Sequence, residues 1–140
     1  MPYGYNVGEV RKMKIIVKKD YEQVSQAALE IMLDIIKNKP NAALGLATGS
    51  TPIRLYELMQ EDHLKNHTSY KNIESYNLDE YYGLSDDNPQ SYYYFMWHHL
   101  FNKLDIDKKN IHVPSGEGNI EDVTKHYNEL LQQHPRDIQL

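Results

Sequence analysis

Short apolar runs alternate with amphipathic stretches along the chain, and this alternation predicts strands and helices in turn. The apolar runs predict strands at residues 13–19, 42–47, 73–78, 110–113 and 138–140. The amphipathic stretches predict helices at residues 21–37, 52–63, 89–104 and 120–133. Strands that alternate with helices indicate an α/β fold, an open, doubly wound and mostly parallel sheet with helices on both faces, of the Rossmann type.

The sequence also predicts the buried face of the first helix and the N-terminal residues of two others. The first helix places one set of apolar residues on one face, which we expect to pack on the sheet: Val24, Ala27, Ala28, Ile31 and Ile35. Thr51 precedes Pro52, and Asn88 precedes Pro89. Since proline suits the first position of a helix, Thr51 and Asn88 are the expected N-caps of the helices that follow.

A small polar segment joins the apolar run 42–47 to the helix at Pro52. It consists of Thr48, Gly49, Ser50 and Thr51. Free backbone N–H groups, hydroxyl donors and the positive end of the helix dipole would meet there, which favours a bound phosphate dianion. An ordinary well-capped turn has the same composition, so this segment alone leaves both interpretations open. No lysine follows the glycine as in a Walker A loop, which argues against a nucleoside triphosphate.

Two carboxylates, Asp79 and Glu80, follow the apolar run 73–78. Ligands of open α/β sheets bind beyond the carboxyl ends of the strands, and both polar segments fall there. Asp79 is therefore placed to remove a proton from a carbon next to a carbonyl group. The alternative is that Asp79 caps a turn or helix and Glu80 is a solvated neighbour.

Aromatic residues and histidines elsewhere add little chemistry. The run 92–97 is more typical of a packing face than of a platform for bases, although one tyrosine hydroxyl can reach a pocket. Tyr92 and Glu80 are candidates to contact and support the substrate-binding residues without touching the substrate. His63 and His67 have the spacing of paired metal ligands, but no third ligand is evident and a solvated surface is favoured. We therefore expect no metal.

Composition narrows the class of protein. The net charge of −5 argues against a general nucleic-acid binder, and no apolar run approaches the length of a membrane span. The 140 residues include no cysteine, which excludes disulfides and thiolate nucleophiles and is compatible with a reducing compartment. We expect a cytoplasmic protein with neither a nucleic acid nor a membrane as its partner.

Three motifs, in matching order and at matching spacings, carry a resemblance to a known family. They are Gly-Leu-Ala-Thr-Gly-Ser-Thr-Pro at 45–52, Asn-Leu-Asp-Glu-Tyr-Tyr-Gly-Leu at 77–84 and Asn-Pro-Gln-Ser-Tyr-Tyr-Tyr-Phe-Met at 88–96. With them the chain resembles the glucosamine-6-phosphate deaminases, also called glucosamine/galactosamine-6-phosphate isomerases, over residues 13–140. Residues 1–12 fall outside the resemblance and form the expected N-terminal extension.

The resemblance implies a carbohydrate-metabolism enzyme of amino-sugar breakdown and a role for each motif. The phosphate of glucosamine 6-phosphate would bind on residues 48–51. Asp79 would accept the C2 proton of the open-chain sugar and return a proton at C1. Hydrolysis of the resulting imine would release ammonium and fructose 6-phosphate, with no metal or organic cofactor.

The family also carries a later segment, with Asn-Gly-His and Asn-Glu-Pro, that supplies ring-opening residues and that does not occur before Leu140. We therefore expect a truncated, N-terminal part of a single isomerase/deaminase domain, with unpaired strand edges that can associate with another copy as a homo-oligomer. Two alternatives remain open. One is a 6-phosphogluconolactonase-like hydrolase, which typically has arginine where Tyr81 stands. The other is a noncatalytic sugar-phosphate-binding domain, for which Asp79 would be unnecessary.

Overall fold

The computed structural model describes residues 13–140, which contain one four-stranded parallel sheet. The strands are β1 (Ala43–Leu46), β2 (Glu74–Asn77), β3 (Ile111–His112) and β4 (Ile138–Gln139), in the spatial order β3-β2-β1-β4. Leu46 of β1 lies opposite Asn77 of β2, so these two strands end at the same level. The expected N-terminal extension, residues 1–12, lies outside the described residues.

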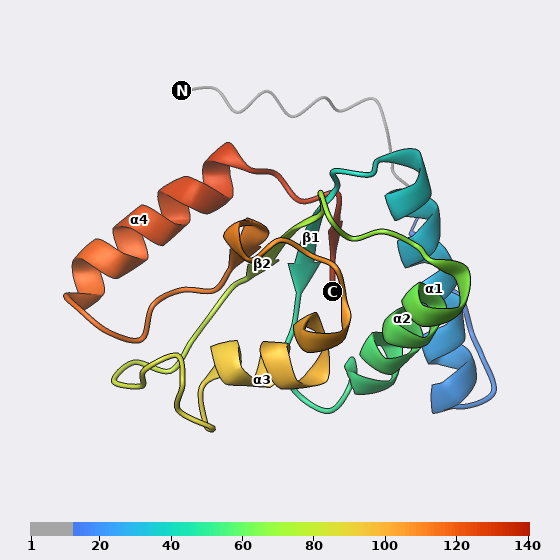
Figure 1. The fold of residues 1–140 in the computed structure, drawn as a ribbon, viewed down its shortest axis with the longest axis horizontal. Helices are drawn as coiled ribbons and strands as arrows, with labels where there is room; N and C mark the ends of the chain where they lie inside the picture. Colours follow the sequence, from blue (N-terminus) through green and yellow to red (C-terminus); the bar gives the residue numbers. More distant parts are fainter. Residues whose placement is uncertain (1–12) are drawn as a thin grey trace.

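Helices cover both faces of the sheet, as the sequence predicts. They are α1 (Tyr21–Asn38), α2 (Ile53–Asn66), α3 (Tyr92–His99) and α4 (Ile120–Gln133), with short 3-10 turns at Phe101–Lys103 and Lys108–Asn110. Figure 1 shows α1 and α2 side by side on one flank of the strands and α4 on the opposite flank. In residues 13–140, no helix combines the length and the apolar character needed to cross a membrane.

The apolar core lies between the sheet and the pair α1 and α2. Leu44 and Leu46 point to the same side because alternate residues of a strand share a face. Both are buried in a cluster with residues of α1, α2, α3 and the segment before β2: Met32, Ile36, Leu55, Tyr56, Met59, Tyr70, Ile73 and Met96. This cluster holds β1 and the start of α2 in fixed positions.

Stacked aromatic rings attach α4 to the opposite face of the sheet. The Tyr76 ring lies 4.6 Å from the His112 ring and 5.8 Å from that of His134, the C-cap residue of α4. From the middle of α4, the hydroxyl of Tyr127 lies 2.5 Å from the carbonyl oxygen of Asn77 and 3.0 Å from that of His112. Since no residue of α4 itself is fully buried, these contacts are its main attachment.

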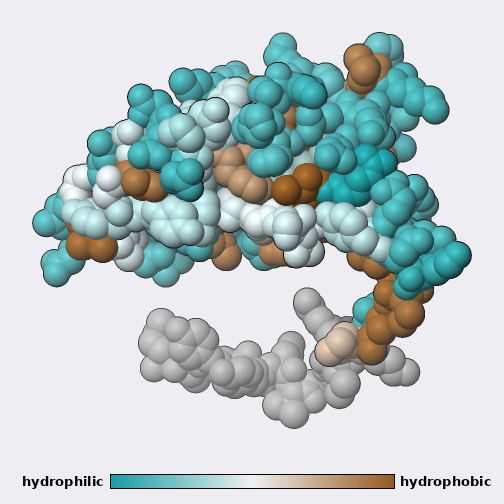
Figure 2. Space-filling view, turned by 90° about the horizontal axis from the view of Figure 1, so that it is seen from below, coloured by the Kyte–Doolittle hydropathy of each residue, from teal (hydrophilic) through white to brown (hydrophobic). Residues whose placement is uncertain are grey.

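The strand predicted at residues 13–19 is wrong. Residues 13–18 have no regular secondary structure, and Met13, Ile15 and Val17 are 85%, 76% and 85% exposed. A strand is held by hydrogen bonds to a neighbouring strand, and this segment pairs with no strand in residues 13–140. In Figure 2 brown apolar surface of the chain stands clear of the main body.

The face predicted to be buried on α1 is only partly correct. Val24 and Ile31 are 50% and 45% exposed, whereas Ser25, Met32 and Ile36 are buried. The buried stripe is thus displaced by about one residue, or roughly 100° around the helix. Packing against α2 sets this rotation.

The proline-marked starts of α2 and α3 are also shifted. α2 begins at Ile53, with Pro52 in the N-cap position and no side-chain cap, so Thr51 is not its N-cap. α3 begins at Tyr92 and its N-cap is Ser91 rather than Asn88, which accepts a hydrogen bond within the preceding turn. α3 also ends earlier than predicted, at His99.

Candidate functional site

The segment Thr48–Thr51, here called the 48–51 loop, follows β1 after the single residue Ala47. Gly49 has a φ of +95°, a conformation that favours glycine, and a Cβ there would meet open space. Within residues 13–140, no hydrogen bond uses the backbone N–H groups of this loop. Ser50 and Thr51 are exposed. The loop therefore presents a row of unused donors at the carboxyl end of the central strand and next to the N-terminus of α2.

Two tyrosine hydroxyls that sequence reasoning missed hold the ends of this loop. Tyr56, fully buried, lies 3.0 Å from the nitrogen and 2.5 Å from the oxygen of Ala47. Tyr21 reaches from α1 to the carbonyl oxygens of Ser50 and Thr51, at 3.0 and 2.8 Å. A buried tyrosine hydroxyl needs a hydrogen-bond partner, which is the one signal that could have drawn attention to Tyr56.

Asp79 lies after β2 with an exposed side chain that makes no hydrogen bond to any residue in the range 13–140. It does not cap a turn or helix, so that alternative is wrong for Asp79. Asp79 and Glu80 line a cleft of about 190 Å³ together with Tyr82, Ser115 and residues of α4. The carboxylate is free to meet a ligand.

Glu80 is not a solvated neighbour. One carboxylate oxygen accepts hydrogen bonds from the backbone N–H groups of Tyr81 and Tyr92, both at 2.8 Å, and the other accepts from Tyr93 at 3.0 Å. Tyr92 and Tyr93 form the first turn of α3, where backbone N–H groups have no partner within the helix. Glu80 thus joins the chain after β2 to the start of α3.

Tyr92 lies close to residues of the two polar segments, the 48–51 loop and the segment after β2. Its ring is 4.6 Å from that of Tyr81. Its pKa is raised above the ordinary value, first by the neighbouring hydroxyl of Tyr81 and then by desolvation and the charge of Asp79, while the hydroxyl of Thr48 acts in the opposite direction.

The loops after β2 and β3 are also packed together. The N–H of Gly83 donates a 2.7 Å hydrogen bond to the carbonyl oxygen of Gly116. A Cβ at position 116 would overlap the carbonyl oxygens of Tyr81 and Leu84, so only glycine fits there. This close approach restrains the segment that carries Asp79.

The described residues offer no evident place for a metal. No group of three or more histidine, cysteine or acidic residues in the range 13–140 could hold an ion. His63 is partly buried, with Nδ1 at 2.6 Å from the carbonyl oxygen of Thr68, and His67 is the left-handed residue that ends α2. The expected solvated surface is therefore correct for His67 only.

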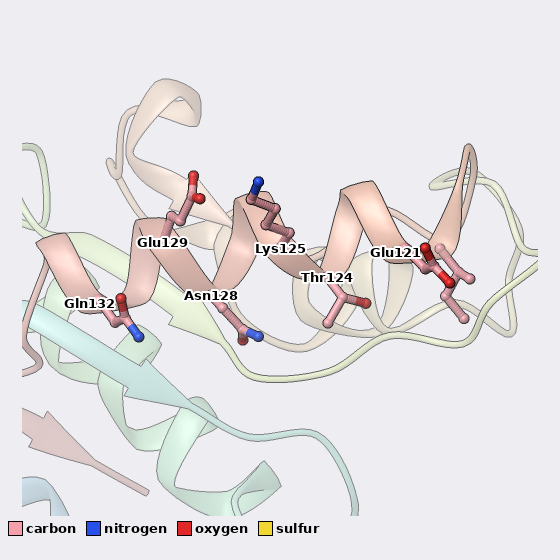
Figure 3. Close-up of a pocket in the computed structure, with 7 residues that line it drawn as sticks. Glu121, Thr124, Lys125, Asn128, Glu129 and Gln132 are labelled. Atoms are coloured by element: carbon pink, nitrogen blue, oxygen red, sulfur yellow. The ribbon is translucent and has the colours of Figure 1, made fainter.

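A second hollow runs along the outside of α4 and has a volume of about 540 Å³. Figure 3 shows that the labelled side chains that line it, among them Lys125, Asn128 and Glu129, all come from this single helix. Within residues 13–140, no other element lines this hollow, and the labelled side chains converge on no common point. The candidate site is therefore the edge that carries the 48–51 loop and Asp79.

Comparison with known proteins gives a consistent result. The family model described as glucosamine-6-phosphate isomerases/6-phosphogluconolactonase matches residues 18–139. A glucosamine-6-phosphate deaminase of Thermoanaerobacter sp. (strain X514) is 45% identical over 121 residues, which are 86% of this chain and 48% of that protein. One of Geobacillus sp. (strain WCH70) is 44% identical over 121 residues, with the same shares. The chain thus spans about half the length of the curated relatives it matches.

Solved structures show the same fold. The structure of a monomeric glucosamine-6-phosphate deaminase has a TM-score of 0.87 and 38% identity, covering 91% of this chain and 54% of that one. A 6-phosphogluconolactonase from Thermotoga maritima has a TM-score of 0.68 at 22% identity, covering 85% and 53%. At 22% identity the second likeness is one of fold alone.

Proposed function

The chain belongs to the family of glucosamine-6-phosphate isomerases and 6-phosphogluconolactonases, and we propose that its residues serve a glucosamine-6-phosphate deaminase reaction. The reaction isomerises and deaminates glucosamine 6-phosphate to fructose 6-phosphate and ammonium. In this proposal residues 13–140 are part of a single sugar-phosphate isomerase/deaminase domain. Its partner is a small sugar phosphate, with neither nucleic acid nor membrane involved.

The 48–51 loop is the proposed phosphate site. Its unused N–H groups, the hydroxyls of Thr48 and Thr51 and the start of α2 are all donors or partial positive charges, which a dianion requires. Binding the phosphate there anchors a group remote from the chemistry, and this orients C1 and C2 of the open-chain sugar. Gly49 leaves the space above the loop open for the ligand.

Asp79 is the proposed general base. Its carboxylate is exposed and unpaired within residues 13–140, so it can accept the C2 proton without first breaking another contact. The same group then returns a proton at C1, and the resulting imine at C2 is hydrolysed to release ammonium. Glu80 fixes the adjoining backbone through its hydrogen bond with the N–H of Tyr92, and Tyr92 is the proposed supporting residue of the site.

One observation carries this proposal: β1 and β2 are adjacent and end in register, Leu46 opposite Asn77. The phosphate loop and the base therefore follow neighbouring strands, and Thr48 and Asp79 are each the second residue after the end of their strand. Such a crevice beyond the carboxyl ends of parallel strands is where open α/β sheets bind their ligands.

A chimera tests the proposed function. The matching 121-residue segment of the Thermoanaerobacter deaminase is replaced by the corresponding residues of this chain, and ammonia release from glucosamine 6-phosphate is measured. We expect turnover above that of the same chimera with Asp79 changed to asparagine. A folded chimera that binds the sugar phosphate but releases no ammonia would contradict the deaminase assignment.

The lactonase alternative is not favoured. The relatives that match at 44–45% identity are deaminases, whereas the lactonase structures match at 19–23%. Tyr81 also stands where lactonases typically carry arginine. We further propose a cytoplasmic location, since the 140 residues include no cysteine. Association of copies into a homo-oligomer stays an expectation that light scattering can test.

A further inference from the structure

We propose that Tyr21 and Tyr56 are positioning residues that turn two N–H groups of the 48–51 loop toward the bound phosphate. This inference rests on the proposed function, because it takes the loop as the phosphate site. It goes beyond it by assigning a role to two side chains that come from different helices and lie outside the family motifs quoted above.

Tyr56 orients the N–H of Thr48. Its hydroxyl lies 2.5 Å from the carbonyl oxygen of Ala47, and the N–H of Ala47 donates to the same hydroxyl at 3.0 Å. The Ala47 carbonyl and the Thr48 N–H belong to one peptide unit. In a trans peptide these two groups point in opposite directions, and the described residues contain no cis peptide. A carbonyl held against buried Tyr56 therefore sends the Thr48 N–H outward.

Tyr21 acts in the same way on Thr51. Its hydroxyl lies 3.0 Å from the carbonyl oxygen of Ser50, which shares a peptide unit with the Thr51 N–H. It also lies 2.8 Å from the carbonyl oxygen of Thr51, whose peptide unit ends in Pro52 and has no N–H. Because the hydroxyl has one proton, it donates a hydrogen bond to one of these two oxygens at a time. Both carbonyls, which would repel an anion, are drawn toward Tyr21.

Tyr21 also selects among the donors at the start of α2. The N–H of Arg54 donates to the Tyr21 hydroxyl at 3.2 Å, so this donor of the first helical turn is no longer free. The N–H groups of the 48–51 loop, by contrast, make no hydrogen bond within residues 13–140. Tyr21 thereby directs an incoming phosphate to the loop and away from the side of the helix.

The position of Tyr21 is itself well defined. Asp20 caps α1 by accepting a hydrogen bond from the N–H of Gln23 at 2.9 Å, and Tyr21 is the first residue of the helix. Glu22 forms a bidentate ion pair with Arg54 of α2, at 2.6 and 2.9 Å. These contacts set the rotation of α1 against α2 and hold the Tyr21 ring over the loop.

The test is a titration of the 140-residue chain with inorganic phosphate, followed by the amide resonances of the 48–51 loop. Three variants are compared with the natural chain: Tyr21→Phe, Tyr56→Phe and, as the control, Tyr76→Phe. Tyr76 is buried like Tyr56, and its hydroxyl donates at 2.9 Å to the carboxylate of Glu74 on β2, away from the loop. A melting curve of each variant separates lost affinity from lost folding.

We expect Tyr21→Phe to weaken phosphate binding about three- to tenfold, the usual worth of one hydrogen bond, with little change in melting temperature. The Thr51 amide resonance should move even without phosphate, which a purely stabilising role would not require. Tyr56→Phe should lower both affinity and stability, since its hydroxyl is buried. Tyr76→Phe should bind phosphate as the natural chain does.

Two results would overturn the inference, and they are distinguishable. If Tyr21→Phe is folded and binds phosphate with unchanged affinity, Tyr21 does not position the loop, although the loop can still be the phosphate site. If phosphate moves no amide resonance of residues 48–51 in the natural chain, the proposed phosphate site fails and the inference fails with it.

Discussion

The backbone N–H of Tyr92 donates a 2.8 Å hydrogen bond to the carboxylate of Glu80. A carboxylate at a helix N-terminus satisfies N–H groups that have no partner in the helix and interacts favourably with its dipole. Glu80 directly follows Asp79, so the same contact restrains the proposed base and places Tyr92 beside it. A change at Glu80 should therefore affect both the stability of α3 and the site.

We expect Glu80→Gln to destabilise the chain by about 1 kcal/mol. The two carboxylate oxygens of Glu80 accept from the N–H groups of Tyr92 and Tyr93, and the neutral amide has only one acceptor oxygen for both. Thermal unfolding followed by circular dichroism should show a melting temperature lower by roughly 2–4 °C. Glu30→Gln, an exposed change in the middle of α1, is the control. Equal melting temperatures for the two variants would mean that the cap contributes nothing.

Asp79→Asn should lower turnover by a factor of about 10² to 10⁴, the usual contribution of a general base, when it is made in the deaminase chimera. The affinity for the sugar phosphate should change little, because the amide is isosteric and Asp79 makes no hydrogen bond within residues 13–140. Ammonia release gives the rate and calorimetry gives the affinity. Asp86→Asn, in the exposed loop that follows, should be silent; full turnover by Asp79→Asn would remove this residue from the mechanism.

Changing Thr48 and Thr51 to valine in the chimera should weaken binding of glucosamine 6-phosphate, since two hydroxyl donors near a dianion are lost. Each charge-assisted hydrogen bond is worth roughly 1.5 to 3 kcal/mol. Unphosphorylated glucosamine should be affected little. Calorimetric titration with both sugars compares the losses, with Thr68→Val beyond the far end of α2 as the control. An equal loss for the two sugars would place the phosphate elsewhere.

The free energy of unfolding should fall as the pH is lowered through about 6.5, because His112 on β3 and His99 on α3 both have lowered pKa values. Burial holds the pKa of His112 below its ordinary value of 6.5. The charge of His134 lowers this pKa further, and the charge of Glu74 raises it. Burial also lowers the pKa of His99. The unfolded chain therefore takes up protons first, so stability is fully present above pH 6.5 and declines below it.

Urea unfolding at about pH 7.5 and pH 5.5 measures this effect. His112→Phe keeps a ring beside Tyr76 and should reduce the difference between the two pH values, while His99 still contributes. His126→Gln, an exposed change on α4, should leave the difference as it is. An undiminished difference in His112→Phe would assign the pH dependence to other groups.

The local pattern of the chain was sufficient for most of the fold. The predicted helix 120–133 is observed as Ile120–Gln133, and the strands predicted at 42–47 and 73–78 are observed as Ala43–Leu46 and Glu74–Asn77. Periodicity reports which residues face the interior, and turn residues report where elements stop, so both are legible without knowledge of distant contacts. That residues 48–51 and Asp79 each follow a strand also comes from this pattern, whereas the tertiary structure alone showed that the two strands are neighbours.

The tertiary structure alone assigned the contacts that support the candidate site. Glu80 meets α3 at a residue 12 positions further on, and the hydroxyl of Tyr21 meets Ser50 at a separation of 29 positions. No local pattern marks either pair, because a hydrogen bond between distant residues depends on how helices and strands pack and not on their periodicity. The same reason explains residues 13–18: their apolar pattern is that of a strand, but a strand exists only where a neighbouring backbone offers hydrogen bonds.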